Sequence, residues 1–240
     1  MRMRRTATTA AAAIVLAIVA VLVPGVATAL ACGASKHASA HVRSGGDRAP
    51  LVIGDSVLQG AVREVAAAGY EVDTRGCRQI GEGLRMIAKR RRARTLARFV
   101  VLALGANGSI RMRDIRAAMR IAGRDRVLGL VTPRELGGGS GSDARVIRAA
   151  GRRFKTRVVV LDWVRASAGR RGWFAGDGLH LGPRGARGMA RLLGGAQSLE
   201  VGPRVRVGPD RMSKPPLGQG DKMAHARCKG REAAGLHSVL

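Results

Sequence analysis

The sequence predicts an α/β fold, a three-layer sandwich in which a five-stranded parallel sheet lies between two layers of helices. Short apolar segments recur along the chain, most of them uninterrupted by polar residues, as strands buried on both faces are. Segments with the composition of helices alternate with them, which is the pattern of repeated strand–helix units. The predicted strands are residues 51–53, 70–73, 99–104, 127–131 and 158–161.

The helical segments between these strands are bounded by residues that start or stop helices. Gly69 suits the end of the first helix because glycine readily adopts the left-handed conformation there. Pro183 suits the first turn of the last helix. A glycine-rich stretch at 137–141 is expected to be a flexible loop and a candidate lid over a substrate. The predicted helices are residues 57–68, 80–97, 110–122, 143–154 and 183–193.

Composition divides the chain into four parts. Residues 1–31 have a basic start, an apolar run and small residues before a cleavage point, which is the pattern of an export signal. Left uncleaved, this run would be an N-terminal anchor and the chain's one contact with a membrane. Residues 32–48 are expected to be a linker, residues 49–195 the folded domain, and residues 196–240, which lack periodicity, a disordered tail. The protein is therefore expected to be secreted or extracytoplasmic.

The three cysteines, Cys32, Cys77 and Cys228, lie far apart in the sequence. Their odd number and spacing match neither a disulfide framework nor a zinc site, and we expect no metal and no cofactor. Within the predicted domain, Cys77 is expected to pack as a small apolar side chain. The order Leu30-Ala31-Cys32 leaves a lipoprotein site as a minor alternative to simple cleavage.

The formal net charge is +27. Such a charge favours an anionic partner such as a cell-surface polymer, a membrane surface or nucleic acid. The arginines are spread along the chain rather than gathered in one stripe, so a bias in composition explains them more simply. Aromatic residues make up 2% of the chain, too few for the stacking platforms that bind single-stranded nucleic acid. We therefore expect no specific nucleic-acid partner.

Polar residues follow the predicted strands at their carboxyl ends, where open parallel sheets bind ligands. Ser56 comes directly after the first strand and before a helix. A serine becomes nucleophilic only with a base, and the base needs an orienting group. His180 is the only histidine of the predicted domain, and Asp177 precedes it by three residues. We expect Ser56 to be a nucleophile, His180 its base and Asp177 the acid that orients the imidazole.

Attack by a serine also requires hydrogen-bond donors for the oxyanion that develops. The backbone N–H of Ser56 is one candidate, and the backbone after the second strand, at Gly76 or Cys77, provides another. The side-chain amide of Asn107, after the third strand, is the third. Asp55, although adjacent to the nucleophile, is expected to shape the loop rather than to transfer protons.

Four motifs occur in order along the chain: Gly54-Asp55-Ser56, the glycine after the second strand, Gly105-Ala106-Asn107 and Asp177-Gly178-Leu179-His180. Together they resemble the four blocks of the SGNH/GDSL hydrolases, and the likeness covers residues 49–195. In detail they are similar to SGNH domains associated with acyltransferases that modify surface polysaccharides, which share an Asp-x-x-x-x-Arg-Gln block, here residues 73–79. The resemblance implies a flavodoxin-like sheet and a Ser56–His180–Asp177 triad that works without a metal. Cys77 stands where many relatives have glycine, so the choice between Gly76 and Cys77 as donor stays open.

The expected function is cleavage of an acyl ester, with an O-acetyl group on a carbohydrate or a cell-surface polymer as the expected substrate. Two alternatives remain: an acyltransferase accessory domain, and a catalytically silent domain that binds an anionic cell-surface polymer. Trp163 and Trp173 are candidates either for the pocket or for the core. The chain lacks Gly-x-Ser-x-Gly, which argues against an ordinary α/β-hydrolase.

Overall fold

The computed structural model describes residues 32–39 and 48–201, and one six-stranded sheet runs through them. The sheet order is β1-β3-β2-β4-β5-β6. All neighbouring strands are parallel except β1 and β3, which are antiparallel. The strands are β1 Ser35–Ala38, β2 Leu51–Gly54, β3 Glu71–Arg75, β4 Phe99–Ala103, β5 Val127–Val131 and β6 Val158–Leu161.

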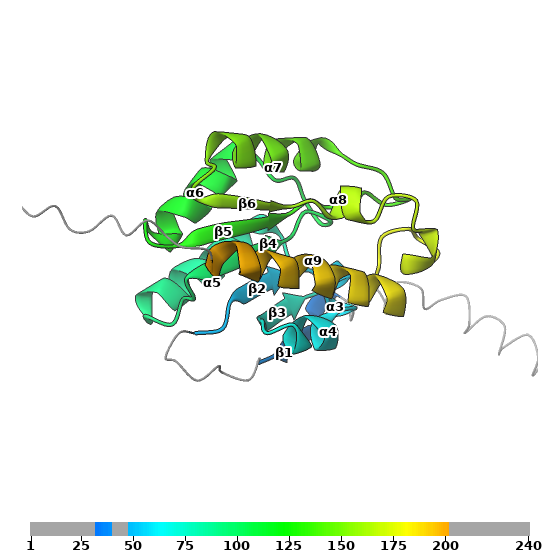
Figure 1. Ribbon diagram of the computed structural model, residues 1–240, viewed down its shortest axis with the longest axis horizontal. Coiled ribbons are helices and arrows are strands. Elements are labelled where there is room, and N and C mark those ends of the chain that lie inside the picture. The colour runs from blue at the N-terminus through cyan, green and yellow to red at the C-terminus, as the bar shows by residue number, and fades with distance from the viewer. Residues whose placement is uncertain (1–31, 40–47, 202–240) are drawn as a thin grey trace, which may run out of the picture. The chain divides into compact units, whose positions relative to one another are not determined.

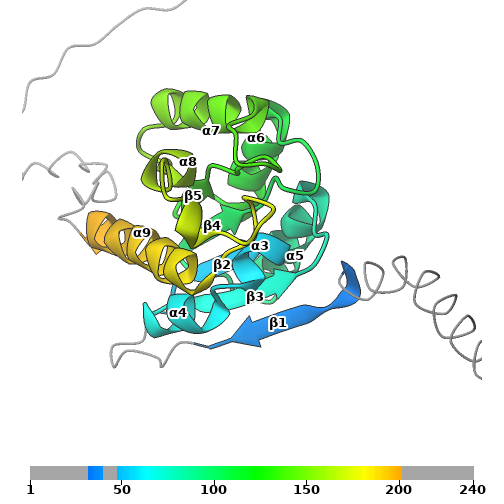
Figure 2. The same cartoon turned by 90° about the vertical axis from the view of Figure 1, so that its right-hand side faces the viewer.

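The five parallel strands are those that the sequence predicts. Numbered among themselves they follow the order 2-1-3-4-5, which is the flavodoxin-like arrangement. Helices cover both faces of the sheet: α5, α6 and α7 pack on one face, and α3, α4, α8 and α9 on the other (Figures 1 and 2). The predicted three-layer α/β fold is therefore confirmed.

The helices differ from the predicted ones in detail. The segment at 57–68 forms two short helices, which separate around Gly60. A Cβ at Gly60 would lie 3.0 Å from the Leu181 carbonyl oxygen. The backbone just after His180 therefore packs closely against Gly60. The helices are α3 Ser56–Gln59, α4 Val62–Ala67, α5 Ile80–Arg92, α6 Met112–Ala122, α7 Ser142–Arg153, α8 Trp163–Ala166, η1 Arg171–Trp173 and α9 Pro183–Val201.

The last helix is longer than expected, so the prediction of a tail from residue 196 is wrong for its first residues. Ala196 is buried in the core, and Gln197 donates a side-chain hydrogen bond to the Ala68 carbonyl. These contacts with α4 continue the helix to Val201. Residues 202–240, the rest of the expected tail, lie outside the described residues.

The predicted linker at 32–48 is wrong at its start, because residues 35–38 form the edge strand β1. The expectation for the cysteines is also wrong: Cys32 and Cys77 form a disulfide, with their Cα atoms 4.8 Å apart. Ser35, Lys36 and His37 are polar and exposed, and the strand is held by backbone pairing. It therefore lacks the continuous apolar run of the other strands. A lipid on Cys32 would require the sulfur atom that the disulfide uses.

The predicted export signal at 1–31 lies outside the described residues. Among the helices of the described part, none combines the length and the apolar character needed to cross a bilayer.

Candidate active site

The carboxyl ends of the parallel strands bring Ser56, His180 and Asp177 together. Ser56 is the first residue of α3, directly beyond β2, and the other two lie in the loop between η1 and α9. The His180 Nε2 atom lies 3.1 Å from Ser56 Oγ, and His180 Nδ1 lies 2.5 Å from Asp177 Oδ2. The result is a hydrogen-bonded chain from serine through histidine to aspartate.

The aspartate and the histidine are held by the turn that carries both. Asp177 Oδ1 accepts hydrogen bonds from the backbone N–H groups of Leu179 and His180, at 2.9 and 3.0 Å. Gly178 takes the left-handed conformation that the turn requires, with φ of 69°. The hydrogen bond from His180 and those from the backbone lower the pKa of Asp177 to about 2. The ionised carboxylate therefore favours the proton on Nδ1 and leaves Nε2 as the acceptor that faces serine.

Three hydrogen-bond donors in the loops that follow β2, β3 and β4 have no partner within the described residues. The Asn107 side-chain Nδ2 is buried and unpaired. The backbone N–H groups of Ser56 and Cys77 likewise make no hydrogen bond there. The Gly76 N–H is occupied, because it donates to the Ala34 carbonyl oxygen at 3.0 Å. Buried donors are normally paired, so an unpaired amide on this rim is what a site for an acceptor oxygen would show.

Asp55 joins the loop that leads into Ser56 to the loop that carries Asn107. Its Oδ1 accepts the Val57 N–H at 3.0 Å and its Oδ2 accepts the Ala106 N–H at 3.3 Å. The side chain is almost fully buried, and burial raises the pKa of Asp55 to about 6, while these hydrogen bonds act in the opposite direction. The contacts are those of a residue that shapes the loop.

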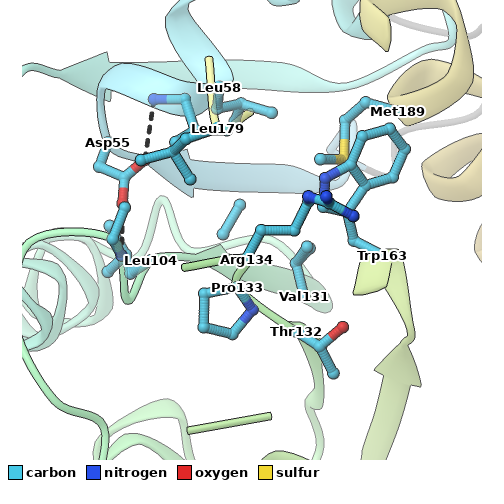
Figure 3. Close-up of a pocket in the computed structure, with 13 residues that line it drawn as sticks. Asp55, Leu58, Leu104, Val131, Thr132, Pro133, Arg134, Trp163, Leu179 and Met189 are labelled. Atoms are coloured by element: carbon cyan, nitrogen blue, oxygen red, sulfur yellow. Dashed lines mark hydrogen bonds between the residues drawn. The ribbon is translucent and has the colours of Figure 1, made fainter. Parts of the chain in front are cut away.

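A cavity of about 30 Å³ opens next to the residues that flank Ser56, Asp55 and Val57. Figure 3 shows Asp55 on one side of it and Arg134, Trp163 and Met189 on the other. Most of the wall is apolar. Besides those four residues the lining comprises Val57, Leu58, Ala103, Leu104, Ala106, Val131, Thr132, Pro133 and Leu179.

The two tryptophans have different places. Trp163 lines the cavity, is 1% exposed, and has an indole Nε1 without a partner among the described residues. Trp173 stacks on Trp163 with the ring centres 5.6 Å apart. Trp163 is therefore both a core residue and a pocket residue. Trp173 is not part of the lining and contacts the pocket only through Trp163.

Arg134 is a residue of the site that the sequence reasoning missed. Its guanidinium donates to the carbonyl oxygens of Gly138, at 2.7 Å, and Gly178, at 3.3 Å, and lies over the Phe174 ring. The Gly137 N–H donates to the Asp177 carbonyl at 2.9 Å. The glycine-rich loop therefore packs directly on the turn of the aspartate and the histidine. Arg134 lies just beyond the carboxyl end of β5, at the same rim as Ser56. That position in the sequence could have indicated that it belongs to the site.

Arg78 belongs to the Asp-x-x-x-x-Arg-Gln block, but the sequence indicated no role for its side chain. It is 4% exposed, and its guanidinium binds the carbonyl oxygens of Gly54 and Asp73 and the carboxylates of Asp73 and Glu82. These bonds tie the end of β2, which leads to Ser56, to β3 and α5. They give a physical reason for the spacing of the Asp-x-x-x-x-Arg-Gln block.

Within the described part of the chain, no three His, Cys, Asp or Glu side chains gather in a way that could hold a metal ion. No protein-family model matches the chain, and no curated protein sequence matches it at a significant level.

Solved structures do match. One is the C-terminal catalytic domain of Streptococcus pneumoniae peptidoglycan O-acetyltransferase A with a methylsulfonyl adduct; it is 22% identical, has a TM-score of 0.52, and the match covers 65% of this chain and 93% of that one. Another is a lipase/acylhydrolase from Enterococcus faecalis, 18% identical with a TM-score of 0.50, covering 63% of this chain and 96% of that one. The chain therefore has the fold of the SGNH/GDSL hydrolases, as its motifs indicate.

Proposed function

We propose that this chain, with its SGNH/GDSL hydrolase fold, is an exported serine esterase that cleaves a short acyl ester, such as an O-acetyl group on a carbohydrate or cell-surface polymer. The observation that carries the proposal is the hydrogen-bonded chain of Ser56, His180 and Asp177, with its distances of 3.1 and 2.5 Å. A serine, a base and an orienting carboxylate in hydrogen-bond reach are the elements of nucleophilic acyl chemistry.

In the first half of the reaction, Ser56 Oγ attacks the acyl carbon while its proton passes to His180 Nε2. The carbonyl π electrons move to oxygen and form the tetrahedral oxyanion. When that intermediate collapses, the C–O bond to the alcohol breaks and the imidazolium returns its proton to the alcohol. In the second half, water loses a proton to His180 and attacks the acyl-serine. Collapse then releases the carboxylic acid and restores the Ser56 hydroxyl.

The oxyanion would be stabilised by the Ser56 N–H, the Cys77 N–H and Asn107 Nδ2. All three lack partners within the described residues. Gly76 is set aside because its N–H already donates to Ala34. Each donor of this kind contributes about 10²–10³ in rate.

The size of the cavity supports a short acyl group. A site needs roughly 10–15 Å³ to hold one water molecule, so a cavity of about 30 Å³ has room for a group of acetyl size. Its apolar lining suits a methyl group. The protein whose fold matches with a TM-score of 0.52 is named as a peptidoglycan O-acetyltransferase, which makes transfer to a hydroxyl acceptor the second candidate.

The disulfide supports export. Cys32 follows the predicted leader at once, and its bond to Cys77 is of a kind that persists in oxidising compartments and is rare in the cytosol. Cleavage after Ala31 would leave Cys32 as the first residue of the mature chain.

The test uses the exported protein and p-nitrophenyl esters of increasing acyl length. We expect hydrolysis of the acetate to exceed that of the octanoate, and a fluorophosphonate probe to label Ser56. The Ser56→Ala variant should lose both the activity and the label while keeping its melting temperature. Equal activity in this variant would refute the mechanism. Absent labelling together with salt-sensitive binding to anionic polymer would favour the silent binding domain. Acetylated oligosaccharide formed when a hydroxyl acceptor is added would identify transfer.

A further inference from the structure

The segment at residues 32–38, named here the N-terminal strap, lies against the turn that follows β3. The strand β1 pairs with β3, with Ser35 opposite Arg75. Figure 2 shows β1 at the sheet edge beside β3. Thr74 Oγ1 donates to the Lys36 carbonyl at 2.9 Å. The strap thus lies alongside β3, the strand that leads directly into the Gly76-Cys77 turn.

Two contacts of the strap are made with this turn itself. The Ala34 carbonyl accepts the Gly76 N–H at 3.0 Å, and the Cys32 sulfur is bonded to the Cys77 sulfur. The same Ala34 carbonyl accepts the side-chain N–H of Gln59, at 2.6 Å, from the helix that starts with Ser56. The strap therefore connects the nucleophile helix with the turn that carries a proposed oxyanion donor.

The backbone of Cys77 is in an unfavourable conformation. Its φ is 57°, in the left-handed region that glycine adopts freely and residues with a Cβ disfavour. A free Cys77 would have a preference for other conformations, and its N–H would then point elsewhere. The turn is held by the Gly76–Ala34 hydrogen bond, by the Arg78 N–H, which donates to the Arg75 carbonyl at 3.3 Å, and by the disulfide. Of these contacts, the disulfide is the one made by the Cys77 side chain.

We propose that Cys32 is a positioning residue for the reaction: through the disulfide and the strap it holds Cys77 in the conformation that presents its N–H to the oxyanion. This inference rests on the proposed esterase function. The disulfide forms when the two thiols give up two protons and two electrons to an external disulfide, which becomes two thiols. Before that step the donor set is incomplete, so the precursor is nearly inactive in a reducing cytosol and becomes active after export.

A purely structural disulfide would affect stability without any special effect on turnover. The two roles separate if Cys77 is replaced by glycine, which needs no disulfide to adopt a φ of 57°. The backbone N–H is unchanged by this substitution. Stability should then stay low while turnover returns.

The experiment uses the exported chain in a Cys228→Ser background, so that the third cysteine cannot exchange. We compare the parent, Cys32→Ser, and Cys32→Ser with Cys77→Gly. For each we measure kcat and KM on p-nitrophenyl acetate and the melting temperature. In a second measurement, the disulfide of the folded parent is reduced with a phosphine below the melting temperature, and kcat and KM are measured again. This result does not depend on whether a variant folds.

We expect Cys32→Ser and the reduced parent to lose about 10²-fold in kcat, the effect of one oxyanion donor, with little change in KM. The Cys32→Ser, Cys77→Gly protein should recover most of this loss at an equally lowered melting temperature. Unchanged kcat in Cys32→Ser or in the reduced parent would overturn the inference, as would an equal loss in both variants. An inactive oxidised parent would instead show that the proposed function itself is wrong.

Discussion

The protonation of Asp55 allows a quantitative test of how the loop between β2 and Ser56 is built. The carboxyl group is 2% exposed, and burial raises its pKa from 3.8 to about 6 against the effect of its two backbone hydrogen bonds. One pKa unit corresponds to about 1.4 kcal/mol, so this difference amounts to about 3 kcal/mol in the free energy of unfolding.

The sign follows from where the proton is held. The unfolded chain releases the Asp55 proton near pH 3.8, whereas the folded protein keeps it until about pH 6. Between these values the folded state binds more protons, so stability falls as the pH rises. The contribution of Asp55 is greatest below pH 3.8 and is about 3 kcal/mol lower above pH 6.

The assay is urea denaturation of the wild type and of Asp55→Asn at closely spaced pH values from about 4 to 8. Because asparagine cannot ionise, the stability of the wild type relative to the variant should decline by about 2 kcal/mol across this range, since part of the full difference is already lost at pH 4. The Ser56→Ala protein, which keeps Asp55, is the matched control and should follow the wild-type pH dependence. A difference between wild type and Asp55→Asn that stays constant over the whole pH range would refute the reasoning.

Three substitutions at the rim test the roles of other residues. Asp177→Asn should lower kcat by about 10⁴ because an amide no longer enforces the productive imidazole tautomer; stopped esterase assays with KM and kcat separated would show it, and a loss confined to KM would contradict it. Asn107→Ala should lower kcat by about 10²–10³, and an unaltered kcat would remove this residue from the donor set. Gly178→Ala should destabilise the protein by about 1–2 kcal/mol, because its φ is 69° and a Cβ would lie 3.1 Å from the Gly137 backbone carbon; a urea denaturation midpoint equal to that of the wild type would show that this turn does not require glycine.

The fold could be predicted because its signals are local. A parallel strand is buried on both faces and is therefore a continuous apolar segment, as residues 99–103 are, with all five residues buried. The flavodoxin-like order of the strands was implied by the resemblance of the motifs to the SGNH/GDSL hydrolases, because connection rules alone leave several orders open. The position of the candidate site could be predicted for a related reason: the carboxyl ends of parallel strands meet at one rim, so a serine after β2 and an Asp-Gly-Leu-His turn before α9 are brought together.

The disulfide and β1 could not be predicted in the same way. Cys32 and Cys77 are separated by 45 residues, and nothing in the polar segment between 35 and 38 shows that it pairs with β3. The pairing of this strand depends on backbone hydrogen bonds, which nearly every residue type can make. The end of α9 has a similar cause, because the contacts of Ala196 and Gln197 with distant parts of the chain extend the helix.

The sequence by itself determined that Ser56 is followed at a distance by one histidine in the domain and an aspartate three residues before it, on a scaffold of alternating strands and helices. Residue type and strand periodicity suffice for that. Only the tertiary structure decided between Gly76 and Cys77 as candidate donor. The Ala34 carbonyl occupies the Gly76 N–H, and the Cys32 sulfur is bonded to Cys77, whose backbone is in a left-handed conformation. Both groups come from a segment far away in the sequence, and only folding brings them to the turn.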